Sequence, residues 1–175
     1  MDKIISKNLR NVCLAGHSSD GKTSLAEAML YLSKATDRLG KTSEGSTVCD
    51  FDEEEIKRGF SLSTAIAPVF WKGMIINLLV CPGYLDFIGE IRQSFRVADS
   101  ALIVVDGKAG VEVGTELAWQ FATEAGIPKA FFINKFDDGE ARFKRVFDGL
   151  RDHFGVAVCP ILIPMIEGDK VIGFL

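Results

Sequence analysis

A glycine-rich segment between an apolar run and a helical pattern constrains this chain more than any other feature of its sequence. Gly16 to Thr23 reads GHSSDGKT and has the GxxxxGK[ST] spacing of a phosphate-binding loop. The run Asn11 to Ala15 in front of it is short and apolar, which predicts a strand. Because phosphate-binding loops lie between a strand and a helix, this context favours such a loop over a glycine-rich turn that only caps a helix. The helix expected behind it would have an apolar face of Leu25, Ala28, Met29 and Leu32.

The loop would hold an anion mainly through its backbone. Its glycines let the chain wrap around a phosphate, and the amides and the positive end of the following helix point towards it. Lys22 would add a full charge, and the Thr23 hydroxyl would be a ligand for Mg²⁺. We expect His17 to contribute only its backbone. The predicted phosphate-binding residues are Gly16, His17, Ser18, Ser19, Asp20, Gly21, Lys22, Thr23 and Ser24.

A second polar motif follows another predicted strand. Asn134, Lys135 and Asp137 form the sequence NKxD directly after the run Ala130 to Ile133, and open α/β sheets bind ligands at that end of their strands. The Asp137 carboxylate would accept hydrogen bonds from N1–H and the 2-amino group of guanine, which adenine does not offer together. Asn134 would hold N7 and brace the loops, and the Lys135 stem would stack on the base. Alone the motif could be a charged loop, but with the phosphate-binding loop it favours GTP and GDP over the alternative, ATP.

Short apolar runs alternate with helical patterns along the rest of the chain. The sequence therefore predicts an α/β fold of the P-loop NTPase class, with a doubly wound, mainly parallel sheet and one antiparallel edge strand. The edge strand would come from a hairpin of Ile66 to Trp71 and Ile75 to Val80. The other predicted strands are Ala101 to Val105, Ala130 to Ile133 and Val158 to Ile163, and the predicted helices are Phe87 to Val97, Val113 to Ala125 and Glu140 to Phe154.

Composition excludes several classes of protein. Of the 175 residues, 47% are apolar and 25% are charged, which is typical of one domain with a buried core. Apolar runs end well short of the roughly 18 residues of a membrane span, and Met1 to Lys7 lacks the apolar core of a secretory signal. We therefore expect a cytoplasmic monomer without membrane contact. The net charge of −4 argues against a broad basic surface for nucleic acid. The unpaired spacing of the cysteines predicts reduced, mostly buried thiols at Cys13, Cys49, Cys81 and Cys159.

One segment of the chain shows no clear periodicity, and another contains a strand that has only begun. Lys34 to Ser61 is long and polar, so we expect a mobile functional loop. Within it, the acidic run Asp52 to Glu55 predicts a solvated helical turn, with Glu54 and Arg58 paired, rather than a metal site. Glu167 to Asp169 predicts a turn and Val171 to Leu175 a strand that has only begun.

With both motifs in place, the chain resembles the GTPase domain of translational GTPases, and elongation factor G and its paralogues above all. The resemblance runs through nearly all 175 residues and implies GTP and GDP as ligands, Mg²⁺ as cofactor, and the ribosome with its RNA as partner. It also implies a GTP-binding domain over residues 1–175 that is incomplete at its C-terminal end, with an inserted subdomain beginning at about 158–175. The segments that carry it are Gly16 to Ser24, Arg58 to Ser63, Cys81 to Phe87, Val113 to Glu116 and Asn134 to Asp137.

The chain departs from this family at two motifs. Where the family has Asp-Thr-Pro-Gly-His, this chain has Val80 to Tyr84, so it lacks the aspartate that supports Mg²⁺ through water and the histidine that places the attacking water. Pro82 and Gly83 are kept, and the Gly83 amide would meet the γ-phosphate. Ser61 stands where the family has threonine and could still bind Mg²⁺, whereas Thr64 is a less suitable substitute.

These departures leave two functions open. The first is a GTP-hydrolysing switch acting in ribosomal translocation, in which Lys22 stabilises charge on the phosphates, Tyr84 positions water, and intrinsic turnover is slow, on the order of 10⁻⁴ s⁻¹. The alternative is a regulatory module that binds GTP without hydrolysing it.

Overall fold

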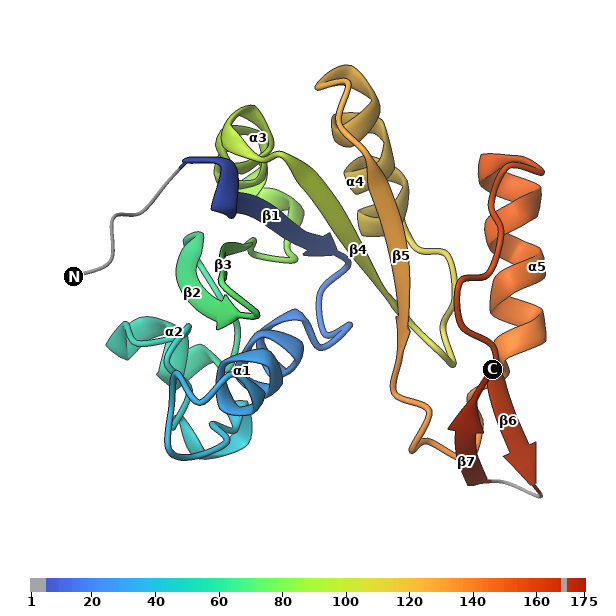
Figure 1. The fold of residues 1–175 in the computed structure, drawn as a ribbon, viewed down its shortest axis with the longest axis horizontal. Helices are drawn as coiled ribbons and strands as arrows, with labels where there is room; N and C mark the ends of the chain where they lie inside the picture. Colours follow the sequence, from blue (N-terminus) through green and yellow to red (C-terminus); the bar gives the residue numbers. More distant parts are fainter. Residues whose placement is uncertain (1–5, 168–169) are drawn as a thin grey trace.

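Five strands form a single sheet in the computed structural model, which describes residues 6–167 and 170–175 (Figure 1). Their order is β2-β3-β1-β4-β5, and all neighbours are parallel except the β2–β3 pair at one edge. This confirms the predicted sheet. Lys72 and Gly73 both have positive φ in the β2–β3 turn, the combination that suits a two-residue hairpin. The strands are β1 (Leu9–Gly16), β2 (Ala65–Trp71), β3 (Met74–Val80), β4 (Ser100–Asp106) and β5 (Lys129–Asn134).

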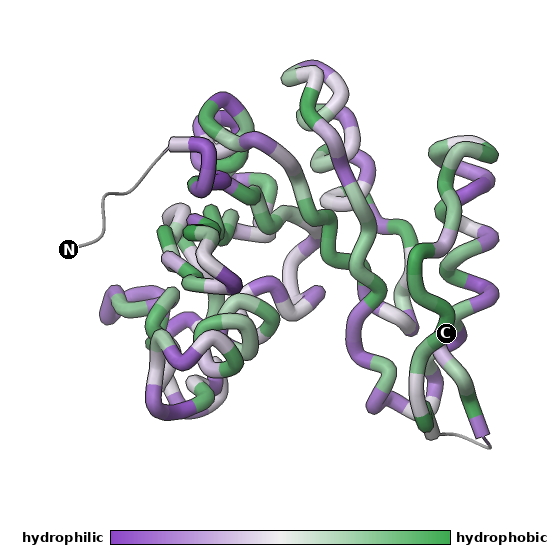
Figure 2. Tube along the Cα trace, viewed as in Figure 1, coloured by the Kyte–Doolittle hydropathy of each residue, from purple (hydrophilic) through white to green (hydrophobic). Residues whose placement is uncertain are grey.

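Helices cover both faces of this sheet. Successive residues of β1 point to opposite faces, so that Leu14 packs in a core with α1 while Cys13 and Ala15 pack in a second core with α3, α4 and α5. Figure 2 shows hydrophobic residues running along the strands between these layers. The helices are α1 (Lys22–Leu32), α2 (Glu53–Arg58), α3 (Ile88–Val97), α4 (Val113–Glu124) and α5 (Phe143–Phe154), with short 3₁₀ turns η1 (Ser6–Asn8), η2 (Thr42–Glu44) and η3 (Leu85–Phe87).

The predicted apolar face of the first helix is wrong in part, since Met29 packs against the core but the face is centred elsewhere. α1 buries Ala26, Glu27 and Leu30, whereas Leu32 is 69% exposed. The prediction followed apolar residues alone, and it therefore missed a face that contains a buried carboxylate.

The strand predicted over Val158 to Ile163 is also wrong, because this segment is irregular. Pro160 lies in the middle of it and has no N–H to donate to a ladder. Pairing begins only at Ile163, whose N–H and C=O both bond to Leu175. Beyond it β6 (Pro164–Glu167) and β7 (Lys170–Phe174) form a hairpin of their own. The turn predicted there includes residues 168–169, which lie outside the described residues.

The long segment Lys34 to Ser61 contains more structure than predicted. Asp52 accepts a hydrogen bond from the Glu54 N–H at the start of α2, and Glu54 pairs with Arg58 at 3.1 Å as expected. Glu55, however, is buried rather than solvated. Its Oε1 accepts hydrogen bonds from the backbone N–H of the two residues that follow Ser61.

Two smaller predictions can also be compared with the structure. Cys13, Cys49 and Cys81 are buried and Cys159 is exposed, and all four are free thiols. Among the described residues, the helices are too short or too polar to cross a membrane.

Candidate functional site

The phosphate-binding loop lies at the carboxyl end of β1 and leads directly into α1, as the sequence predicts. Both motif glycines have positive φ, 144° at Gly16 and 90° at Gly21. A Cβ at Gly16 would lie 2.3 Å from the Val104 carbonyl oxygen, and one at Gly21 would lie 2.4 Å from the Asn134 side chain. Glycine is therefore required at both positions by backbone conformation and by close neighbours.

The second motif lies at the carboxyl end of β5, and a hydrogen bond from its Asn134 side chain joins it to the first motif. The Asn134 amide donates to the Asp20 carbonyl oxygen at 2.8 Å. Lys135 has a φ of 60°, and its ammonium lies 2.8 Å from the Asp106 carboxylate. Asp137 is exposed in the turn that follows. The two motifs, 114 residues apart at this bond, thus meet at one edge of the sheet.

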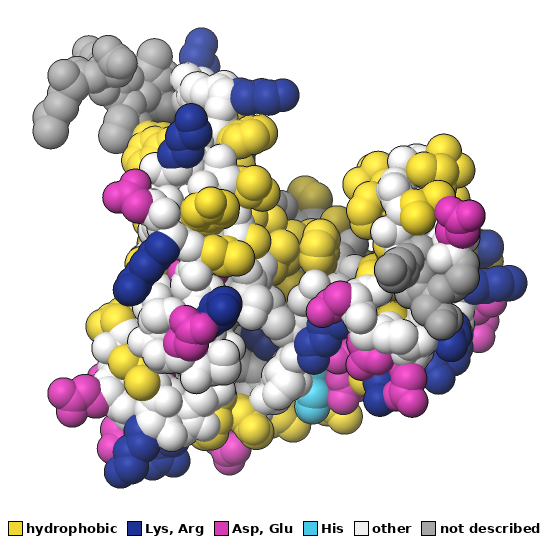
Figure 3. All heavy atoms as spheres, turned by 90° about the horizontal axis from the view of Figure 1, so that it is seen from below, with side chains coloured by type: hydrophobic (Ala, Val, Ile, Leu, Met, Phe, Trp, Pro, Cys, Tyr) yellow, Lys and Arg dark blue, Asp and Glu magenta, His cyan; other side chains and the backbone are white. Residues whose placement is uncertain are grey.

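A cavity of about 290 Å³ lies against this loop. Its wall contains Ser18, Ser19 and Gly21 to Ser24 of the glycine-rich loop, the Gly59 to Ser61 segment, Gly83 with Tyr84, and Lys135. Most of the predicted site residues therefore face one space. On the face drawn in Figure 3, Lys and Arg side chains alternate with Asp and Glu, without a continuous basic patch among the described residues.

Hydroxyl and carboxylate oxygens gather at one side of this cavity. Thr23 Oγ1 and Ser61 Oγ are 3.4 Å apart, and Ser61 donates to Asp50 Oδ1 at 2.6 Å. Such hard oxygen donors are the ligands that Mg²⁺ prefers, so the residues fit the metal that the sequence predicts. Val80 contributes nothing here because it is 1% exposed within the core around α1.

Asp50 is a site residue that sequence reasoning missed. It is 7% exposed and lines the cavity. Burial raises the pKa of its carboxyl, while the hydrogen bond from Ser61 opposes that rise. The sequence places several other acids within five residues of it, and nothing in their spacing distinguishes the one that faces the cavity. Thr64 does not face it, because its hydroxyl contacts the Glu90 carbonyl oxygen and Ser94 Oγ.

The segment after β3 approaches the glycine-rich loop closely. A Cβ at Gly83 would lie 2.6 Å from both Lys22 Nζ and the Ser18 Cα. The next residue, Tyr84, is 40% exposed at the cavity wall, and its ring centroid lies 4.5 Å from that of Phe60. Tyr84, the predicted water-placing residue, therefore packs against an aromatic side chain from another loop.

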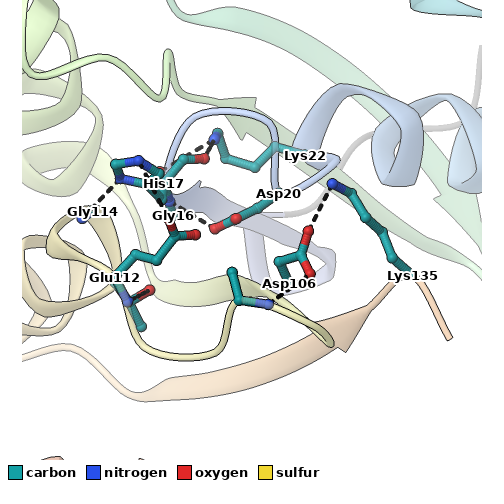
Figure 4. A network of polar contacts seen from close by, with 10 residues as sticks. Gly16, His17, Asp20, Lys22, Asp106, Glu112, Gly114 and Lys135 are labelled. Carbon is teal, nitrogen blue, oxygen red and sulfur yellow. Dashed lines mark hydrogen bonds and ion pairs between the residues drawn. The ribbon is translucent and has the colours of Figure 1, made fainter. Parts of the chain in front are cut away.

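The Lys22 side chain is buried beneath the loop to which it belongs. Its ammonium donates to the carbonyl oxygens of Gly16 and His17 (Figure 4). Burial lowers the pKa of Lys22. His17 contributes more than the backbone expected of it. Its Nδ1 accepts a hydrogen bond from the Gly114 N–H, and its Nε2 lies 3.6 Å from the Glu112 carboxylate. The His17 side chain therefore joins the loop to the start of α4.

Asp20 turns inward from the same loop. Its Oδ2 accepts a hydrogen bond from the His17 N–H at 2.8 Å, and the side chain is 1% exposed. Burial raises the pKa of this carboxyl to about 7, although Lys22 opposes the rise. The folded protein therefore binds this proton more tightly than the unfolded chain. The resulting stability is present at low pH and is lost as the pH rises from about 4 to about 7.

We expect Asp20→Asn to gain stability relative to the wild type as the pH increases. The difference in free energy of unfolding should grow by about 2 to 3 kcal/mol between about pH 5 and about pH 8, because asparagine keeps an acceptor for His17 but carries no charge. Urea unfolding at both pH values measures it. Asp152→Asn, at an exposed position on α5, is the control and should show no such growth. A difference independent of pH would contradict the expectation.

Comparison with known proteins adds to this geometry. The sequence model of the elongation factor Tu GTP-binding domain matches residues 7–169. The elongation factor G-like protein of Mycobacterium tuberculosis is 42% identical over 167 residues, which cover 95% of this chain and 23% of the relative. Elongation factor G of Dehalococcoides mccartyi is 36% identical over 159 residues, covering 91% of this chain and 23% of the relative. The chain thus spans about a quarter of the length of these curated relatives.

A solved structure agrees in fold and sequence. A crystal structure of a protein from Thermus thermophilus superposes with a TM-score of 0.91 at 40% identity. The match covers 95% of this chain and 25% of that one.

Proposed function

Because the chain belongs to the family of the elongation factor Tu GTP-binding domain and is homologous to elongation factor G, we propose that it binds GTP and GDP and hydrolyses GTP as a switch in ribosomal translation. The hydrogen bond from Asn134 to the Asp20 carbonyl oxygen carries the proposal, since it holds the base-reading motif against the phosphate-binding loop. The cavity beside that bond is lined by the phosphate-binding loop and by Lys135 of the second motif.

We propose that the chain acts mainly by positioning charges. Lys22 would exchange its two carbonyl partners for phosphate oxygens, and the backbone N–H of Gly83 would meet the γ-phosphate. Thr23 and Ser61 would hold Mg²⁺, with Asp50 accepting from Ser61, and the metal when bound would neutralise charge on the phosphates. The Tyr84 hydroxyl can both donate and accept a hydrogen bond, which suits a group that orients water.

We propose that Asp137 selects guanine over adenine, and a substitution tests this selectivity. Asp137→Asn should weaken GTP binding by about 10- to 100-fold, because one charge-assisted acceptor is lost, and should favour xanthosine triphosphate instead. Titration calorimetry with GTP, ATP and xanthosine triphosphate measures both changes. Asp152→Asn should leave all three affinities unchanged. No heat with either GTP or GDP in the wild type would refute the proposal.

Hydrolysis needs its own assay because Val80 and Tyr84 depart from the family motif. We expect ribosomes to stimulate phosphate release from GTP well above a slow intrinsic rate of about 10⁻⁴ s⁻¹. A protein that binds GTP with no release above background in the presence of ribosomes would be the regulatory module instead. We also propose that β6 and β7 begin an inserted subdomain and that the ribosome, including its RNA, is the partner.

A further inference from the structure

Two buried thiols meet beside the proposed γ-phosphate segment. Cys13 lies in β1 and Cys81 directly follows β3, and their sulfur atoms are 3.2 Å apart. Cys13 is 0% exposed and Cys81 is 1% exposed. We propose that Cys13 and Cys81 are an oxidation site that forms a reversible disulfide and thereby fixes the segment that begins at Pro82.

The two ends of this pair are held differently. Cys13 lies within β1 and is paired with Leu79 of β3 on one side and with Ala101 of β4 on the other. Cys81 lies beyond the last ladder pair of β1 and β3, Leu14 with Val80, and its N–H donates to the Leu14 carbonyl oxygen. A disulfide has a length of about 2.05 Å, so the sulfurs must approach by about 1.1 Å. The displacement will occur mainly at Cys81, because Cys13 is held from both sides.

Hydrogen peroxide alone can oxidise the two thiols to a disulfide, with water as the only other product. The Cys81 thiolate attacks one oxygen of hydrogen peroxide, which gives a sulfenic acid and releases water after proton transfer. The Cys13 thiol then attacks the sulfenic sulfur: the S–S bond forms, the S–O bond breaks, and the leaving hydroxide takes up the proton that Cys13 releases. Two thiols and one peroxide thus give one disulfide and two waters. The hydrogen bond from Cys13 lowers the pKa of Cys81 despite its burial, which supports Cys81 as the first nucleophile.

The expected effect of the disulfide on nucleotide affinity rests on the proposed function. Gly83 lies two residues after Cys81, close to Lys22 Nζ and Ser18. Its amide would contact the γ-phosphate, which GDP lacks. A shift of Cys81 should therefore lower affinity for GTP by about tenfold, equivalent to one lost hydrogen bond to a charged group, and should leave affinity for GDP nearly unchanged.

The other two cysteines serve as internal controls. Cys49 is similarly buried but lies near Glu27, and Cys159 is exposed. The purified protein would be treated with hydrogen peroxide, unfolded, alkylated and digested for mass spectrometry. We expect a peptide pair linked through Cys13 and Cys81 that dithiothreitol separates, with Cys49 alkylated. Cys13→Ser and Cys81→Ser should each abolish this pair.

Each outcome has one meaning. If Cys159 is oxidised while Cys13 and Cys81 remain alkylated at every peroxide concentration, the oxidation site is overturned. If the linked pair forms but the ratio of GTP to GDP affinity stays the same, fixation of the γ-phosphate segment is overturned. Failure of the proposed function has a different signature, because reduced protein would then bind neither nucleotide while the linked peptides could still form.

Discussion

Lys22→Ala should weaken GTP binding by about 100- to 1000-fold, which corresponds to the roughly 3 to 4 kcal/mol lost when a buried charge pair is truncated. Lys22 is only 6% exposed, and its ammonium lies where the glycine-rich loop and Gly83 converge. A phosphate placed there would interact with the charge away from bulk water. Titration calorimetry or displacement of a fluorescent GDP analogue measures the loss.

Lys57→Ala is the matched control because Lys57 is an exposed lysine on α2. It removes the same charge from the surface, so its effect on GTP affinity should be less than about twofold. Urea unfolding of both variants would establish that each is folded. An equal loss of affinity in the two variants would mean that net charge, rather than the Lys22 position, governs binding.

Glu27→Ala should lower the free energy of unfolding by about 2 to 4 kcal/mol. The Glu27 carboxylate is 0% exposed, and its Oε1 accepts hydrogen bonds from the backbone N–H of Val48 and Cys49, at 2.7 Å and 3.1 Å. Alanine would leave both N–H groups without this acceptor. Part of the loss is offset, since Glu27 Oε2 is buried and has no hydrogen-bond partner among the described residues.

Urea unfolding measures this loss, and Glu53→Ala is the control because Glu53 is exposed in the first turn of α2. That variant should change stability by less than about 0.5 kcal/mol. If Glu27→Ala were equally mild, water or another backbone group would have to replace the carboxylate as acceptor for Val48 and Cys49.

The sequence predicted best those features of the fold and the site that depend on a local pattern of residues. GHSSDGKT between a strand and a helix located the loop, and the alternation of apolar runs predicted the order of layers. The β2–β3 hairpin was predicted from two neighbouring apolar runs, Ile66 to Trp71 and Ile75 to Val80, and the structure pairs them. These features need only neighbours in sequence to specify them.

Features that depend on tertiary contacts escaped prediction. Glu27 and Asp50 are acids that become buried only when the Lys34 to Ser61 segment folds against α1 and the loop. Cys13 and Cys81 are separated by 68 residues, and only the pairing of β1 with β3 brings their sulfurs together. His17 gains a side-chain role in the same way, through α4. Periodicity carries no signal for such contacts.

The contact between the rings of Phe60 and Tyr84 has a thermodynamic consequence. Phe60 belongs to the loop that ends near Ser61, and Tyr84 to the segment that begins at Cys81, so each loop forms part of the other's apolar surroundings. Separating the rings costs both loops the same contact. The coupling between the two loops is reciprocal. If placing the Phe60 loop at the cavity stabilises the Tyr84 segment there, the Tyr84 segment stabilises the Phe60 loop by the same free energy. A ligand that contacts either loop therefore stabilises the position of both loops at the cavity.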